Sequence, residues 1–537
     1  MPLSRFPFVA LVFLAAAFLP LTANGQKLAR KAFEDTEYGY KFKHPDDFKP
    51  VPPRPSDKEA GIICKMDGKE LTVRTDSGAV RVDAEGMLLR FAERTERGKE
   101  GRGGSVSETK VRDDVAEYLD RRYKGVNKDK PDTDEEKKIG GLKSRHRTWK
   151  GTTPSYGIPL LIDVWTFPLS DADVHLVYIV PVEHEKKWMK VFEKSAKTFA
   201  EIERKESAGA VGRGASYDEL LAYHKADAEK LAGWTALDTP SKKFIIKTNC
   251  DNRKFIKEVI KRLEASRKLY EGDFPPSADF SAVSVVRVCA NEEEFHTYGN
   301  TGGGTLGWFN PASVELVLFD AVNVDRNMSY AVMSHEAFHQ YCHFLFEQSE
   351  AHRWFDEGHG DYYGAAKFSG SRAKITDKMP GGLNRKDIIK AMVRDGSYTP
   401  VDEHINFDHS QWRAANGSTG VDSYCQSWSL IYMLRQGSLK KVPKKVWKPE
   451  YADIIPNYVT TLHGGFRAAY DEILAEREAQ AKKEGRELTD EESDVNRFDL
   501  KRGQKDEIWE KAIEASWGQI DLEEFEKDWL TFVGEHL

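Results

Sequence analysis

Apolar runs in the first 205 residues predict strands closed by one helix. Residues 38–43 alternate between aromatic and polar side chains, and residues 160–167 and 174–180 are apolar runs rich in strand-forming residues. A helical period then places five side chains on one face: Trp188, Val191, Phe192, Ser195 and Phe199. We therefore expect residues 26–205 to form an N-terminal α/β domain. It contains no catalytic constellation, so an accessory role is expected.

The pattern after this domain changes from mixed to mainly helical. Ser216-x-x-Glu219 is a capping box, which predicts the start of a helix. The expected fold class of the whole chain is α+β. The patterns divide this part of the chain into a Gly-rich linker and helix (206–240), an α/β lobe (241–325), two helices (326–368) and a mainly helical lobe (369–537).

Candidate chemistry lies on the first of the two helices, in the pattern His335-Glu336-x-x-His339. Residues four apart share one helix face and lie about 6 Å apart along the axis, so both imidazoles can bind one metal ion. Glu336 lies beside that ion and can accept a proton from water that the metal activates. Two neutral nitrogen ligands with an adjacent carboxylate predict a Zn²⁺ site.

A third ligand is expected from the second helix. Glu357 follows His339 after seventeen intervening residues, and Asp361 lies one turn further along the same face. There, Asp361 can hydrogen-bond the far nitrogen of a ligating histidine. His352 and His359 remain alternative ligands, although His359 does not share the face of Glu357. A further histidine, at position 343, lies about 12 Å along the axis from the first one and is too distant to share the ion.

These residues resemble the gluzincin metallopeptidases, the clan of thermolysin and the zinc aminopeptidases, and also secreted bacterial proteins with a peptidase-MA-like domain. The resemblance rests on His335-Glu336-x-x-His339 and on Trp354-Phe355-x-Glu357-Gly358-x-Gly360-Asp361-Tyr362, within residues 241–537. It implies zinc held by His335, His339 and Glu357. It also implies Glu336 as general base and Asp361 as the partner of a ligating histidine.

The same resemblance implies two further features. Tyr424 takes the place of the gluzincin Tyr or His that donates a hydrogen bond to the developing oxyanion, and simple packing is the alternative. The strand over residues 314–319 takes the place of the sheet edge that holds substrate, and an ordinary buried strand is the alternative. The Gly-x-Met-Glu-Asn signature of zinc aminopeptidases is absent, which favours an endopeptidase.

The N-terminus predicts export. Residues 1–25 combine Arg5, an almost wholly apolar segment and the small residues Ala23-Asn24-Gly25, which is typical of a cleaved secretory signal. We therefore expect a secreted, periplasmic or cell-envelope protein, with no stable membrane span after cleavage. The Tyr38-Gly39-x-x-Phe42-x-x-Pro45 segment that follows loosely resembles PsbP-like domains.

Charge and composition narrow the range of partners. The 537 residues include 80 basic and 87 acidic ones, and a net charge of −7 provides no field that would attract nucleic acid. Five cysteines are too few for a disulfide scaffold. The sequence thus predicts a secreted zinc metallopeptidase acting on a peptide or protein, with its oligomeric state open. The alternative is an exported zinc-binding or scaffold protein of the same fold with little or no activity.

Overall fold

The computed structural model describes residues 27–537 except 37, 76–77, 92, 98–107, 113, 155, 170–171, 204–214, 277–281, 300, 312, 370–371, 380–383, 418–419, 494 and 502. The predicted signal segment and most of the predicted linker lie outside these residues. Two compact units are present. The first comprises the chain up to Glu34, Gly39–Val51 and Gly61–Glu203, and the second comprises Asp35–Tyr38, Pro52–Ala60 and Arg204–Leu537.

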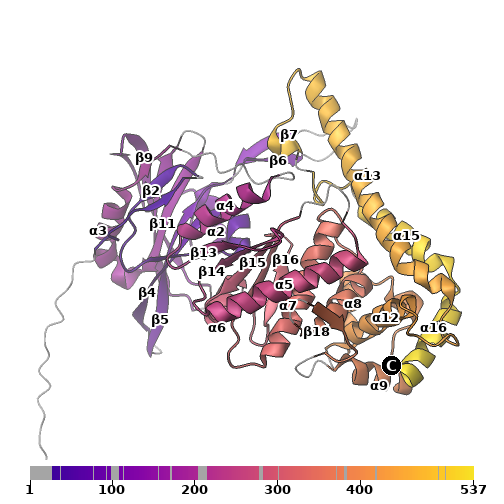
Figure 1. Ribbon diagram of the computed structural model, residues 1–537. Helices are drawn as coiled ribbons and strands as arrows, with labels where there is room; N and C mark the ends of the chain where they lie inside the picture. Colours follow the sequence, from indigo (N-terminus) through magenta and orange to yellow (C-terminus); the bar gives the residue numbers. More distant parts are fainter. Residues whose placement is uncertain are drawn as a thin grey trace, which may run out of the picture. The chain divides into compact units, whose positions relative to one another are not determined.

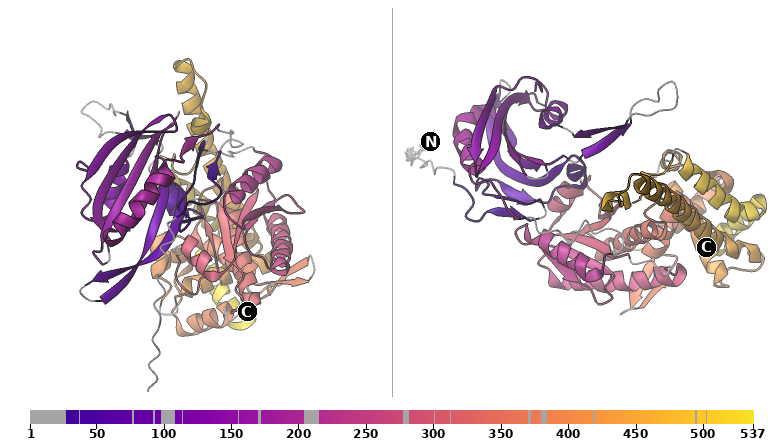
Figure 2. Two further views of the ribbon diagram at one scale, coloured as in Figure 1. Left: turned by 90° about the vertical axis from the view of Figure 1, so that its left-hand side faces the viewer. Right: turned by 90° about the horizontal axis from the view of Figure 1, so that it is seen from above.

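The first unit is built on a large β-sheet, drawn in indigo and purple in Figures 1 and 2. Its seven strands have the order β3-β4-β5-β11-β10-β9-β8, and each neighbouring pair is antiparallel. The strands are β3 (Lys49–Val51), β4 (Ile62–Thr75), β5 (Gly78–Leu89), β8 (Thr133–Ile139), β9 (Leu142–Thr152), β10 (Pro159–Pro168) and β11 (Asp173–Pro181). Two smaller sheets contain β1 (Phe33–Asp35), β2 (Tyr40–Phe42) and β12 (Ala200–Glu201), and β6 (Glu93–Arg97) and β7 (Glu108–Arg112).

Helices cover both faces of the large sheet, because apolar side chains alternate along its central strands. Helix α3 (Glu185–Ala196) packs on one face, where Phe192 stacks on Tyr178. Helix α2 (Val115–Arg122) packs on the other face, in a cluster with Val177 and Ile179. The predicted buried positions of α3 are confirmed at Trp188, Val191, Phe192 and Ser195, whereas Phe199 lies beyond the end of the helix.

The second unit begins with a three-layer α/β lobe. Its sheet has the order β13-β14-β15-β17-β16, in which β14, β15 and β17 are parallel. The strands are β13 (Thr235–Asp238), β14 (Phe244–Thr248), β15 (Ser284–Cys289), β16 (Gly307–Asn310) and β17 (Glu315–Phe319). Helices α5 (Arg253–Asp273) and α7 (Arg326–Leu345) share a core with one face. Helices α4 (Tyr217–Glu229), which has the predicted capping box, and α6 (Glu292–Gly299) share a core with the other.

The position of β17 corrects one expectation. The strand predicted over residues 314–319 does not form the sheet edge, because β17 pairs with both β15 and β16 and all its residues are buried. The alternative, an ordinary buried strand, describes it. The edge strand on this side is β16, whose four residues are only partly covered apart from Gly307. The sequence pattern did not predict β16, because its four residues, Gly-Trp-Phe-Asn, are few and follow a Gly-rich segment.

The remainder of the second unit is mainly helical, so the α+β fold class is confirmed. After the short helix α1 (Pro55–Glu59), the later elements are α8 (Arg353–Gly364), the hairpin β18 (Ala366–Ser369) and β19 (Arg372–Ile375), α9 (Arg385–Asp395), α10 (Val401–His404), α11 (His409–Ala414), α12 (Asp422–Ser438), α13 (Ile454–Lys483), α14 (Asp490–Ser493), α15 (Gln504–Ser516) and α16 (Leu522–Thr531). No helix in the described ranges is long and apolar enough to cross a membrane.

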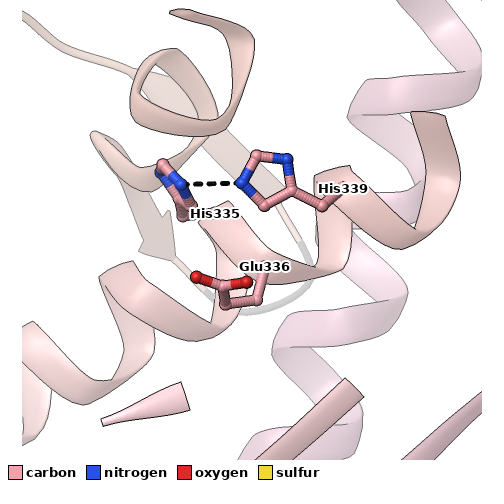
Figure 3. Close-up of side chains that lie close together, drawn as sticks. All are labelled: His335, Glu336 and His339. Atoms are coloured by element: carbon pink, nitrogen blue, oxygen red, sulfur yellow. Dashed lines mark hydrogen bonds between the residues drawn. The ribbon is translucent and has the colours of Figure 1, made fainter. Parts of the chain in front are cut away.

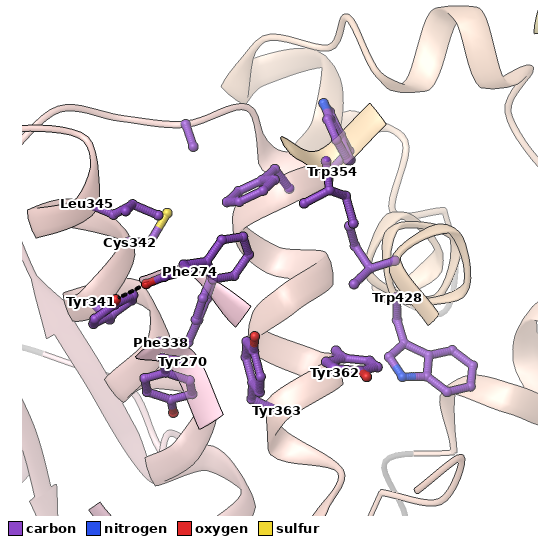
Figure 4. Packing of buried hydrophobic residues seen from close by; sticks show 14 of the residues in the cluster. Tyr270, Phe274, Phe338, Tyr341, Cys342, Leu345, Trp354, Tyr362, Tyr363 and Trp428 are labelled. Atoms are coloured by element: carbon purple, nitrogen blue, oxygen red, sulfur yellow. Dashed lines mark hydrogen bonds between the residues drawn. The ribbon is translucent and has the colours of Figure 1, made fainter. Parts of the chain in front are cut away.

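Aromatic side chains fix α7 and α8 in the core. Phe338 of α7 packs against Tyr363 of α8, and Tyr270 of α5 contacts both rings (Figure 4). Trp354 and Trp428 are buried in the same cluster, which continues into α12. Aromatic rings bury large areas and pack with defined geometry, so this core sets the angle between α7 and α8.

Candidate metal centre

The second unit brings three of the predicted site residues together where α7 meets α8. Asp325 caps α7, since its side chain accepts a hydrogen bond from the Asn327 amide. His335 and His339 follow on one face of that helix, and Glu357 comes from the second turn of α8. Figure 3 shows the two imidazole rings turned toward each other, with Glu336 beside them.

Three donor atoms form a small triangle at this junction. His335 Nε2 lies 2.9 Å from His339 Nε2, and the Glu357 Oε2 oxygen lies 3.1 Å from the first and 3.3 Å from the second. Ligand atoms around a tetrahedral zinc with bonds of 2.0–2.1 Å are separated by about 3.3 Å. The triangle therefore has nearly the dimensions of one face of a zinc tetrahedron, which leaves the fourth corner open.

Carboxylates hold the far nitrogens of both histidines. Asp361 Oδ1 lies 3.0 Å from His335 Nδ1, and Asp356 Oδ1 lies 2.7 Å from His339 Nδ1. A carboxylate only accepts hydrogen bonds, so each Nδ1 carries a proton, and each Nε2 points inward, where it offers a lone pair once the ring is neutral. Lone pairs of two imidazoles and one carboxylate then converge, an arrangement that a divalent cation stabilises. The donor set fits zinc.

The surrounding carboxylates raise the pKa of both imidazoles. Burial opposes protonation of His335, but its hydrogen bonds to Asp361 and Glu357 outweigh this and raise its pKa to about 9. Burial likewise opposes protonation of His339, and the charges of Asp356 and Glu357 hold its pKa well above the ordinary value. A site that favours a proton in this way also favours a metal cation, which must displace that proton to bind.

Glu336 lies within the same group but is turned toward the sheet. Donor atoms of His335, Glu336 and His339 all lie within 4.8 Å of one another. The Glu336 Oε2 oxygen accepts a hydrogen bond of 2.9 Å from the Phe309 amide on β16. Burial raises the pKa of Glu336. Because Glu357 approaches both Nε2 atoms more directly, Glu357 suits the third ligand position, and Glu336 is placed to accept a proton beside the ion.

Three charged residues that sequence reasoning missed hold the ligands in place. Asp356 bonds His339, as described above. Arg353 donates to Glu357 Oε1 at 3.1 Å, which leaves Oε2 to face the histidines. Arg385 of α9 donates to Asp361 Oδ2 at 2.6 Å, and its charge keeps the pKa of that carboxyl low although burial opposes this. The four-residue spacing of Arg353 and Glu357 could have revealed their pairing, whereas nothing in the sequence links Arg385 to the site.

Two glycines permit the close approach of α8 to its neighbours. A Cβ atom built on Gly360 would lie 2.8 Å from His335 Cε1 and 2.9 Å from His335 Nδ1. One on Gly358 would lie 2.7 Å from the Ser427 carbonyl oxygen of α12. Neither distance is compatible with a side chain. Glycine at positions 358 and 360 therefore allows α8 to pack against both α7 and α12.

A cleft of about 790 Å³ opens onto the candidate metal centre. Its lining includes His335, Glu336, His339, Glu357, Phe309 and Tyr424, residues 349–353, 408–410 and 505–506, and also Asn406, Trp509 and Glu510. Tyr424 packs edge-on against Trp412, with ring centroids 4.4 Å apart. Burial raises its pKa, so the phenol stays protonated and can donate. The structure thus puts Tyr424 in the same cleft as the candidate ligands.

The other histidines considered as ligands lie elsewhere. His359 is fully buried, with Nδ1 bonded to the Phe355 carbonyl oxygen at 2.8 Å and Nε2 facing Arg435 at 3.2 Å. His352 lines the cleft but bonds Tyr458 through Nδ1 at 3.0 Å. Both rings are therefore already held by contacts outside the three-atom triangle.

Comparisons with known proteins do not assign this chain to a family. No family model matches the chain, and neither does any curated protein. Among solved structures, one similar chain is PA94 from Pseudomonas aeruginosa, a protein of unknown function. That match covers 24% of this chain and 96% of the other, with 10% identity and a TM-score of 0.15, and it carries no argument about fold or function.

Proposed function

We propose that this protein is a zinc-dependent metallopeptidase of the gluzincin type, and that it acts as a secreted endopeptidase. The observation that carries the proposal is the triangle formed by His335 Nε2, His339 Nε2 and Glu357 Oε2, with Glu336 beside it in an open cleft. In a structural zinc site, four protein ligands fill the coordination shell, and no additional carboxylate is needed beside the ion. Three ligands and a base match the needs of hydrolysis.

Each residue of the site has a defined role in this proposal. Bound zinc would polarise the scissile carbonyl and lower the pKa of a water molecule. Glu336 accepts the proton of the attacking water and passes it to the leaving amine, a task for which its raised pKa is suited. Tyr424 donates its phenolic hydrogen to the developing oxyanion. Asp361 and Asp356 keep both imidazoles oriented with Nε2 toward the ion.

An extended peptide would bind along β16 in this scheme. This strand forms the edge of the sheet, and its Phe309 amide bonds Glu336 directly. A strand at a sheet edge can bind an extended peptide by β-strand addition. A peptide in that position would present its backbone beside the general base, which suits cleavage within a chain.

The decisive experiment compares Glu336→Gln with the wild type on casein and on a peptide library. Glu336→Gln should bind one zinc per chain and lose at least about 100-fold in kcat/KM, since the base is removed while the three ligands remain. Glu293→Gln, an exposed residue of α6, provides the matched control and should retain full activity. Equal turnover by Glu336→Gln would refute the role of Glu336. Zinc binding by a wild type that cleaves nothing, with or without chelator, would favour the scaffold alternative.

A further inference from the structure

One wall of the cleft carries an arginine whose outer N–H groups have no part in the proposed chemistry. Arg353 lines the cleft, and 28% of its side chain is exposed. Its NH1 group donates to Glu357 Oε1, and its Nε and NH2 groups both point at His409 Nδ1, at 3.1 and 2.5 Å. A guanidinium has five N–H donors, so a single imidazole nitrogen is a poor match for the outer edge of Arg353.

The His409 imidazole cannot accept a hydrogen bond from both of the arginines beside it. His409 lies between two guanidinium groups, because Arg413 NH2 approaches its Nε2 at 2.7 Å. A neutral imidazole has one nitrogen lone pair, and an imidazolium has none. At least one guanidinium therefore faces an N–H group, and this short arrangement contains more donors than acceptors.

No acidic side chain among the described residues supplies the missing acceptor. Within the described part of the chain, no carboxylate forms an ion pair with Arg413, and that of Arg353 is Glu357, the proposed zinc ligand. Asp408 is adjacent in sequence, but its carboxylate caps α11 by accepting from the Gln411 amide at 2.7 Å. Glu350, also on the cleft wall, is bonded to Arg497 at 3.1 Å. The surplus donors thus remain available to a ligand.

We propose that Arg353, His409 and Arg413 form a subsite for a carboxylate of the substrate, next to the bond that is cleaved. A carboxylate has two oxygens in one plane, which match the fork of a guanidinium and add the acceptors that the cluster lacks. Its place along the substrate follows from Glu357, whose Oε1 touches Arg353 and whose Oε2 faces the histidines. Arg353 is separated from the proposed metal position by the Glu357 carboxylate alone, so the recognised charge belongs to a residue near the scissile bond.

The carboxylate has two sources in a peptide, the free C-terminus and an Asp or Glu side chain. This inference rests on the proposed peptidase function, and peptide binding to zinc-loaded Glu336→Gln, which cannot turn over, tests it without relying on activity. One peptide is compared with a free and an amidated C-terminus. A second, amidated pair carries Glu or Gln beside the expected cleavage position. We expect the member with the carboxylate, in one pair or both, to bind about ten-fold more tightly.

The cluster is then altered at the residue furthest from the metal. Arg413→Gln in the same background should reduce the ten-fold preference to about one, and 0.5 M salt should weaken it in the parent. Arg394→Gln, which removes an exposed arginine paired with Asp395 on α9, provides the control and should keep the preference. Equal affinity for charged and uncharged peptides, with cleavage by the wild type intact, would overturn the subsite alone. Absence of both peptide binding and cleavage would overturn the peptidase proposal and the subsite together.

Discussion

At the scale of single residues, the carboxylates behind His335 and His339 decide whether the candidate centre can hold a metal ion. His335 and His339 can bind one ion only if each ring carries its hydrogen on Nδ1, and Asp361 and Asp356 impose that choice. Arg385 in turn keeps Asp361 ionised in a buried position. An imidazole that lost its carboxylate could rotate or carry the hydrogen on Nε2, so both acids matter for metal affinity.

Replacement of Asp361 should weaken zinc binding without unfolding the protein. In Asp361→Asn, Arg385 loses its ion-pair partner and His335 loses the anion that fixes its tautomer. Removal of such an outer partner typically lowers metal affinity by about 10- to 100-fold. Competition with a chelator at pH 7.5 measures the change. Asp395→Asn, which breaks an exposed pair, should leave zinc affinity unchanged, and an Asp361→Asn variant with the parent affinity would contradict this role.

Asp356 allows an independent test on the second imidazole. Its Oδ1 accepts from His339 Nδ1, so Asp356→Asn should also lose about 10-fold or more in zinc affinity. The two substitutions act on different rings held by one ion, and their combination should show strong coupling in a double-mutant cycle. An Asp356→Asn variant with the zinc affinity of the parent would mean that His339 does not bind the ion that His335 binds.

Residue types and spacing were enough to predict the centre of this site but not its surroundings. His335 and His339 are four residues apart, and so are Glu357 and Asp361, so each of these two pairs could be placed on one helix face from the sequence alone, with Glu336 beside the first pair. The part played by Asp356 depends on the angle between α7 and α8, which is a property of packing. Arg385 arrives from a separate helix, and no local pattern reports such a contact.

At the scale of elements, glycine controls how near α8 comes to the metal helix. Gly360 contacts the His335 ring so closely that Gly360→Ala must push the two helices apart or turn the imidazole. Overpacking of this kind costs about 1–3 kcal/mol. We expect lower stability in denaturant unfolding together with reduced zinc affinity. Gly464→Ala in α13, where an added Cβ meets nothing within 4 Å, should be neutral or stabilising. A Gly360→Ala variant as stable and as zinc-competent as the parent would show that the helices separate at no cost.

The sheet illustrates what patterning leaves undecided among elements. The apolar run at residues 314–319 was recognisable as a strand, but an edge strand and a central strand differ only in whether a further strand pairs with them. Strand β16 is the further strand that pairs with β17. It has only four residues and follows a Gly-rich segment, so it is too short to show the two-residue hydrophobic period of a strand. The sheet edge on this side is consequently formed by Gly307–Asn310, and the Phe309 amide there bonds Glu336, the proposed general base.

At the scale of the whole molecule, zinc should stabilise the second unit through linkage. The three proposed ligands come from α7 and α8, which meet only in the folded state, so zinc held by them would favour the native form over the unfolded chain. Free zinc at 100 times Kd would add about 2.7 kcal/mol to the free energy of unfolding. Calorimetry with and without chelator measures this effect. His335→Ala should unfold at the same temperature in both conditions, and an equal zinc response in that variant would place the metal elsewhere.

Acid should destabilise the second unit through histidines that are buried in the neutral form. Burial lowers the pKa of His404, which bonds Ser427 Oγ at 2.8 Å, and of His352 to about 3 each. The unfolded chain protonates histidine near pH 6.5, so between about pH 6.5 and 3 it binds protons that the folded state does not. The stabilising contribution is therefore complete above pH 6.5 and declines as the pH falls through this window, by about 2 kcal/mol per histidine between pH 7 and 5.

Urea unfolding of zinc-free protein at pH 7 and at pH 5 should show this decline in the free energy of unfolding. His404→Gln should make the decline smaller by about 2 kcal/mol, whatever the stability of the variant at pH 7. An unchanged pH dependence in His404→Gln would mean that His404 is protonated equally in the folded and unfolded states.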